Sequence, residues 1–183
     1  LPLREPSRLR YASSDIALSG RLRRFEWRTL PFSLRGDRAA VDVQGLRLEA
    51  GQAWLSAHGK LALAAASPFD LQLEGHLDIE ALDPALPGRT LGGTVELQLH
   101  VGGTLESPAL AGSLALADVR GRFEGARWND LDVTATFAGR ELRVERLQAN
   151  LLGGKLSASG SVPLFGGDDG GERSRFRFEM QDV

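Results

Sequence analysis

The chain has 183 residues, enough for one sizeable domain or two small ones, and 42% of them are apolar and 25% charged, a globular composition. The formal net charge is -2 with the charges scattered, which excludes the clustered basic surface that nucleic-acid binding requires. The nearest candidate, residues 21–28, interleaves arginines with Glu26 and is better interpreted as a solvated strand face. The absence of cysteine excludes disulfides and Cys-based zinc sites.

The two ends of the sequence lead us to expect a single segment, 1–183, of a longer chain. It begins LPLREPSRLRY, with neither a starting methionine nor a charged-then-apolar leader, and it stops in the middle of a strand pattern. No apolar run approaches the length of a membrane-spanning helix.

Alternation of apolar and polar residues is the main pattern along the chain. Apolar residues two apart line one face of a strand, whereas a helix needs spacings of three and four. The alternation predicts short strands within 16–22, 30–34, 41–43, 46–48, 55–63, 69–79, 95–101, 114–116, 119–123, 131–137, 142–144, 156–164 and 176–180. The predicted fold class is therefore all-β, with antiparallel or mixed strands.

Three local features punctuate this pattern. IEALDPAL, residues 79–86, predicts one helical turn ended by Pro87 and Gly88. GGDDGGERS, residues 166–174, predicts a flexible hairpin tip. Glycines on the apolar phase predict bends or close backbone approaches, and hence a strongly curved sheet; they are Gly20, Gly59, Gly75, Gly93, Gly112, Gly121 and Gly160.

An internal repeat of about 100 residues is also predicted. A shift of 101 residues lays 16–63 on 117–164 with eleven identities, about twice what composition would give. The identities include Gly20/Gly121 and Trp27/Trp128, and LSAHG at 55–59 falls on LSASG at 156–160. The approximate repeats are 1–101 and 102–183, the second incomplete.

Two stretches resemble the TamB family, which is related to the AsmA-like proteins. GTLESPALAGSLAL at 103–116 resembles a recurring signature of that family. Residues 118–164 resemble its repeat unit through a spacing of leucines and glycines. That spacing is met by Leu131, Gly139, Leu142, Val144, Leu147, Ala149, Gly153, Gly154, Leu156, Gly160 and Val162. The chain departs from the pattern at 52–59, where the glycine pair is missing, and over residues 1–15.

The resemblance implies a long curved sheet folded into an open apolar-lined groove, similar to a β-taco. It also implies a periplasmic location in a Gram-negative bacterium, in a parent chain anchored in the inner membrane. The implied cargo is phospholipid or another acyl-chain lipid, or nascent outer-membrane proteins, and the implied partner is an outer-membrane TamA-like β-barrel protein. No cofactor, metal or enzymatic activity is expected.

The apolar phase of the strands supplies the predicted groove-lining residues. Each buried Leu, Val or Phe contributes roughly 1.5–3 kcal/mol, so the face needs a second sheet, closure into a barrel, or an apolar occupant. The predicted lining comprises Leu18, Leu30, Phe32, Val43, Leu55, Leu61, Leu71, Leu73, Leu77, Val95, Leu97, Leu99, Leu114, Leu116, Phe123, Leu131, Val133, Phe137, Val144, Leu156, Val162, Phe176 and Phe178.

The residues that could indicate another function are explained better by a structural role. His58, His76 and His100 fall on the polar phase, and no matched spacing makes them a metal site. No GxSxG elbow or phosphate-binding loop occurs, and Asp168-Asp169 fits an exposed turn better than a calcium repeat. Trp27 and Trp128 are interpreted as packing posts at sheet corners, with lipid contact as the alternative. A β-solenoid or adhesin-type stalk and a β-sandwich accessory domain of an enzyme remain as rival hypotheses.

Overall fold

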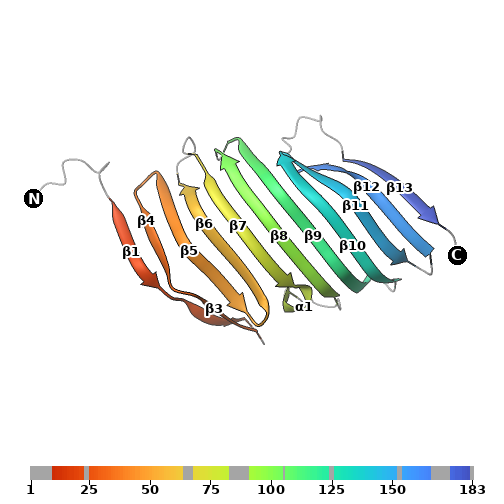
Figure 1. The fold of residues 1–183 in the computed structure, drawn as a ribbon, viewed down its shortest axis with the longest axis horizontal. Coiled ribbons are helices and arrows are strands. Elements are labelled where there is room, and N and C mark those ends of the chain that lie inside the picture. The colour runs from red at the N-terminus through yellow and green to blue at the C-terminus, as the bar shows by residue number, and fades with distance from the viewer. Residues whose placement is uncertain are drawn as a thin grey trace, which may run out of the picture.

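The chain folds into one antiparallel sheet of 13 strands that stays open instead of closing into a barrel. The computed structural model describes residues 10–22, 25–63, 68–82, 91–104, 106–123, 126–151, 154–165 and 174–181. Figure 1 shows the sheet as a single layer, with the N-terminal strand at one end and the C-terminal strand at the other. The all-β prediction is confirmed, and all strand pairs in the sheet are antiparallel rather than mixed.

The elements follow one another along the sheet nearly in chain order. They are β1 (Tyr11–Ile16), β2 (Ser19–Leu22), β3 (Phe25–Thr29), β4 (Phe32–Gly36), β5 (Ala40–Ala50), β6 (Ala53–Ala62), β7 (Asp70–Asp78), α1 (Ile79–Leu82), β8 (Leu91–Gly103), β9 (Pro108–Phe123), β10 (Ala126–Gly139), β11 (Glu141–Leu151), β12 (Gly154–Pro163) and β13 (Arg175–Gln181). From β4 onward each strand pairs with the next in sequence, so the sheet is built from local hairpins.

The N-terminal end of the sheet departs from this simple order. β3 and β4 both pair with β5, β4 beside its first half and β3 beside its last residues. β1 then pairs with β4, and β2 with β3. The predicted strand at 30–34 is therefore wrong in its start, because Pro31 cannot donate a backbone hydrogen bond and lies between β3 and β4.

Several strands are longer than the sequence predicted, because they continue through bulges that break the alternation. Val43 and Leu46 are three residues apart, yet they share a face because Gly45, with a φ of 73°, is the extra residue of a bulge in β5. Asp118, with a φ of 52°, plays the same part between Leu116 and Val119 in β9. The predicted short strands 41–43 and 46–48 are thus one strand of 11 residues, and 114–116 and 119–123 belong to one of 16.

The helical prediction is confirmed for its first turn, α1, which packs against β7 and β8. Residues 83–90 and most of the predicted hairpin tip, 166–173, lie outside the described residues. α1 has four residues, and the structure contains, over the described ranges, no helix long and apolar enough to cross a membrane.

Candidate ligand-binding face

The apolar side chains gather on one face of the sheet. Residues paired directly across an antiparallel ladder point to the same side, so the register identifies this face. One row crosses it from β5 to β13 through Leu48, Leu55, Gly75, Leu97, Leu114, Ala135, Val144, Gly160 and Phe176. With inter-strand spacings of about 4.8 Å, its eight steps span roughly 38 Å. We call this side of the sheet the apolar face.

Nearly all the predicted lining residues share the apolar face. The exceptions are Leu18 and Leu30, which lie at the breaks between β1 and β2 and between β3 and β4, and Phe123, whose side chain is outside the described residues. Leu18 is 52% exposed and Leu30 38%. The register brings the remaining predicted residues together, although their sequence positions span most of the chain.

Several residues of the apolar face were missing from the predicted set. Leu46 and Leu147 each follow a bulge, and Leu110 pairs with Val101 near the start of β9. The signal for the first two is a change of alternation phase, three residues after Val43 and Val144 respectively. A bulge inserts one residue and restores the phase, so this signal is readable in the sequence.

The apolar face has little cover. Among the described residues, elements in substantial contact are neighbours in the sheet or involve α1 against β7 and β8. Most large apolar side chains are half-buried by same-face neighbours, and no large one is fully buried in the described ranges. Ala135, in the middle of the sheet, is fully covered because Leu114 and Val144 flank it. At the C-terminal strand, exposure rises to 65% for Phe178 and 72% for Met180.

Glycines on the apolar face lie beside large side chains. A Cβ placed on Gly75 would come within 2.9 Å of the Leu55 side chain, and one on Gly160 within 2.7 Å of the Phe176 ring. A Cβ on Gly20 would meet the indole of Trp27 at 2.7 Å. The Trp27 indole therefore packs against Gly20, its partner in the β2–β3 ladder, whereas the Trp128 side chain is outside the described residues.

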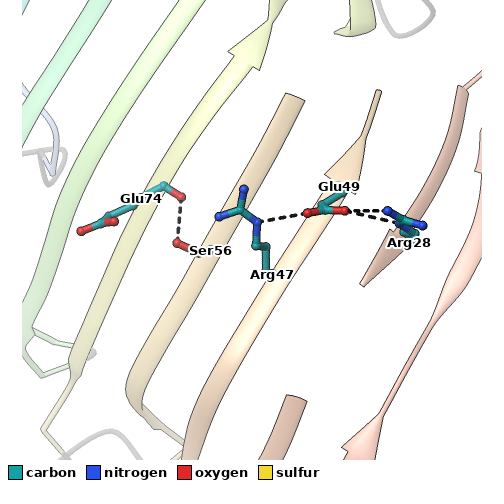
Figure 2. A network of polar contacts seen from close by, with 5 residues as sticks. All are labelled: Arg28, Arg47, Glu49, Ser56 and Glu74. Carbon is teal, nitrogen blue, oxygen red and sulfur yellow. Dashed lines mark hydrogen bonds and ion pairs between the residues drawn. The ribbon is translucent and has the colours of Figure 1, made fainter. Parts of the chain in front are cut away.

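The opposite face of the sheet is polar and carries a chain of side-chain contacts, drawn in Figure 2. Glu49 on β5 accepts hydrogen bonds from Arg28 on β3, at 3.1 and 3.3 Å, and from Arg47 at 3.2 Å. The Arg28 hydrogen bond is the main cause that holds the pKa of Glu49 below its ordinary value of 4.5. Arg47 also lies over the Trp54 ring, 4.3 Å from its centroid, which places Trp54 on this polar face.

The histidines also belong to the polar face. His100 pairs with Asp70 at 3.0 Å and His76 lies 3.7 Å from Glu96, while His58 faces Gln72 across the ladder. No group of three or more potential metal ligands occurs among the described residues. Shallow hollows are found on this side as well, one lined by Asp132, Arg146, Lys155 and neighbours, another by Tyr11, Asp42, Lys60 and neighbours.

No protein-family model matches the chain, and no solved structure matches its fold.

Proposed function

We propose that this chain is a periplasmic segment of a TamB-like protein, whose parent chain is anchored in the inner membrane. In this role the apolar face carries the acyl chains of phospholipid, or the apolar residues of nascent outer-membrane strands, towards a TamA-like β-barrel partner. The supporting observation is one continuous apolar face, about 38 Å long, with no second layer over it in the described residues. The role needs neither catalysis nor a cofactor.

The chemistry of the face favours flexible acyl chains. Its rows consist almost wholly of Leu, Val, Phe, Ala and Gly, with Met180 on β13, and the ionisable side chains paired across the ladders lie on the opposite face. A surface of this kind supplies contact area without hydrogen-bonding groups to select a head group. One leaflet of a bilayer core is about 15 Å thick, so an acyl chain would lie across only part of a row.

We propose further that the sheet curls lengthwise so that the apolar face lines an open groove. Bulges increase the local twist of a strand, and glycines permit bending where side chains would collide. Bulges occur in β1, β5 and β8–β11, and glycines interrupt the apolar face at Gly59, Gly75, Gly112 and Gly160. Both features support curvature across the whole width of the sheet.

The two halves of the sheet are, in this proposal, copies of one unit of about 100 residues. The ladder pair Val43–Gly59 reappears, with both numbers raised by 101, as Val144–Gly160. The bulge that follows Val43 reappears after Val144. The bond from the Leu63 amide to the Ala39 carbonyl, at 2.7 Å, has its counterpart between Leu164 and Arg140 at 2.8 Å.

Lipid analysis of the purified protein tests the lipid role. We expect phospholipid to co-purify with the wild-type chain and to be detected by mass spectrometry. Val133→Asp places a charge on the apolar face and should remove most of the lipid while the far-ultraviolet circular dichroism stays that of the wild type. The matched control, Thr134→Asp, alters the next residue of the same strand on the polar face and should retain lipid.

Two results would overturn the proposal. Wild-type protein free of lipid, and unable to take up a fluorescent fatty acid, would exclude an acyl-chain carrier. If Val133→Asp fails to fold while Thr134→Asp folds, the apolar face acts as a core and not as a binding surface.

The stalk hypothesis is less well supported in its β-solenoid form. A β-solenoid stacks parallel coils around a sealed interior, whereas sequential strands here are antiparallel neighbours in an open sheet. If the chain is an interaction stalk that binds proteins and not lipid, the Val133→Asp variant should bind those proteins as well as the wild type does.

A further inference from the structure

The polar face of the sheet carries a groove that runs along β12. One hollow, of about 490 Å³, is lined by Ser157 and by longer polar side chains of β10, β11 and β13. A second hollow, of about 230 Å³, lies over Ser159. Arg146 and Ser157 line both hollows, which therefore form one continuous groove. Its floor, from Lys155 to Ser159, is about 14 Å long at roughly 3.4 Å per residue.

Short side chains on β12 and long ones on its two neighbours create this groove. Figure 1 shows β12 between β11 and β13, which form the walls. Ser157 lies between Gln148 on β11 and Glu179 on β13 in the ladders, and Ser159 faces Arg177 on β13. The first hollow is of the size found in small-ligand sites.

A bulge adds a further polar side chain to the β11 wall. It places two residues of β11, Glu145 and Arg146, opposite the single residue Ser159 of β12. Both side chains line the second hollow. They are held by hydrogen bonds, because Thr136 donates to Glu145 at 3.2 Å and Arg146 donates to Gln148 at 2.5 Å. Bulges of this kind re-aim side chains and are over-represented beside functional sites.

The matching hairpin β5–β6 lacks this combination of floor and wall. The floor position that Ser159 occupies on β12 is His58 on β6, 101 residues earlier. The bulge position that Arg146 occupies on β11 is Gly45 on β5. The floor residue is larger there and the wall residue has no side chain, so the hairpin geometry that both halves share does not by itself create the groove.

The groove presents hydrogen-bond donors and acceptors together, with nearly balanced charge. Its described lining includes four acidic and three basic side chains, which are Asp130, Asp132, Glu145, Glu179, Arg146, Lys155 and Arg177. Three amide side chains and two serines add neutral donors and acceptors. A polyanion or a polycation would therefore meet charges of its own sign along the groove.

A sugar chain fits this chemistry better than a peptide or a lipid does. Each hydroxyl group donates one hydrogen bond and can accept two, so it uses carboxylates, amides and guanidinium groups at once. A peptide cannot add to β12 as a strand, because β11 and β13 pair with both of its edges. An acyl chain finds no apolar contact, because the register directs the apolar lining residues to the opposite face; they are Leu147, Ala149, Leu156 and Ala158.

We propose that the groove along β12 binds a linear, uncharged glycan. Arg146 and Ser157 occupy the middle of the groove and contact sugar hydroxyls from the wall and from the floor. This site is separate from the apolar face, because the two lie on opposite sides of the sheet.

Titration with uncharged sugar hexamers, followed by the NMR signals of the backbone amides, tests the proposal. The probes are the hexamers of β-1,4-linked glucose and of β-1,4-linked N-acetylglucosamine. At least one of them should shift the Ser157 and Ser159 amides saturably. It should bind at least about tenfold more tightly than its monosaccharide, because a chain contacts both hollows and adds hydrogen bonds.

Two variants and a matched control locate the site. Ser159→Phe fills the second hollow and should weaken hexamer binding by at least about tenfold. Phenylalanine favours strands, so this variant should keep the far-ultraviolet circular dichroism of the wild type. Arg146→Met removes the donors but keeps the length of the side chain, and should weaken binding by about five- to tenfold. The control His58→Phe, at the matched position of β6, should leave binding unchanged.

Four outcomes would overturn the inference. Wild-type protein that shows no saturable shift with either hexamer has no glycan site. Unchanged binding in both Ser159→Phe and Arg146→Met, or equal losses in Ser159→Phe and His58→Phe, would place the site away from β12. Binding of a galacturonic acid hexamer as tightly as the uncharged hexamers would contradict the preference for an uncharged chain. None of these results depends on whether the apolar face binds lipid.

Discussion

The hairpin β5–β6 and the hairpin β11–β12 have the same internal register but different neighbours. Leu46 faces Ala57 in the first, and Leu147 faces Ala158 in the second, 101 residues later. Beyond the first hairpin lie β7, which pairs with β6, and β8, which pairs with β7. Beyond the second lies only β13 in the described part of the chain, and its apolar residues are exposed.

This difference teaches that local hairpin geometry is set by the segment itself, whereas burial is set by how many strands follow it. Leu73 and Phe178 occupy matched places, opposite Ala57 and Ala158 respectively. Leu73 is half-buried between β6 and β8, while Phe178 is 65% exposed. Substitutions at matched positions in the two halves of the sheet test this comparison.

The largest effect is expected at Gly59, the counterpart of Gly160. Gly59 has a φ of 116°, and a Cβ there would lie 2.0 Å from the Asp70 carbonyl oxygen on β7, which is held between β6 and β8. Gly59→Ala should cost about 3 kcal/mol in the free energy of unfolding. Gly160→Ala should cost about 1–2 kcal/mol, because β13 is an edge strand that can shift away from the new methyl group. Urea denaturation measures both, and equal losses would mean that the sheet edge is as rigid as its interior.

A smaller effect is expected for side-chain truncation at Leu73 and Phe178. Leu73→Ala should lower the free energy of unfolding by about 2 kcal/mol, since it removes apolar contacts on both sides. Phe178→Ala should lower it by less than about 1 kcal/mol, although Phe is larger, because most of its surface already faces solvent. A greater loss at Phe178 would show that its ring is covered within one molecule.

The smallest effect is expected for the stability of β3 when the pH is lowered. Arg28 and Glu49 pair across β3 and β5, and the matched ladder pair in the second half is Asn129–Asn150, which carries no charge. Because the pKa of Glu49 is lowered in the folded state, its contribution to stability is present above pH 4.5 and is lost as the pH falls through the lowered value. The protection factors of amides near β3, which exclude the intrinsic pH dependence of hydrogen exchange, should therefore fall in acid more than those at the matched place on β10.

The control for this effect is Arg28→Gln. The substitution should return the pKa of Glu49 towards its ordinary range, measured by NMR titration, and should flatten the pH dependence at β3. An unchanged pKa in the variant would assign the shift to Arg47, the weaker hydrogen-bonding partner of Glu49.

The sequence by itself determined most of the strand content, except β1 and β3, and the identity of the apolar face. Alternation has a period of two only in extended chains, so residues such as Leu71, Leu73 and Leu77 could be placed on one side without a structure. The strand boundaries that were predicted wrongly have local causes. Pro31 interrupts the predicted strand at 30–34. The bulges at Gly45 and Asp118 break the alternation, so that two long strands were predicted as four short ones.

Only the tertiary structure decided how the strands pair and whether the sheet closes. Alternation fixes which way a side chain points but not which strand lies beside it, because backbone hydrogen bonding is the same for every partner. Openness likewise depends on the far ends of the sheet, β1 and β13, and the alternation in β13 is the same as that of interior strands.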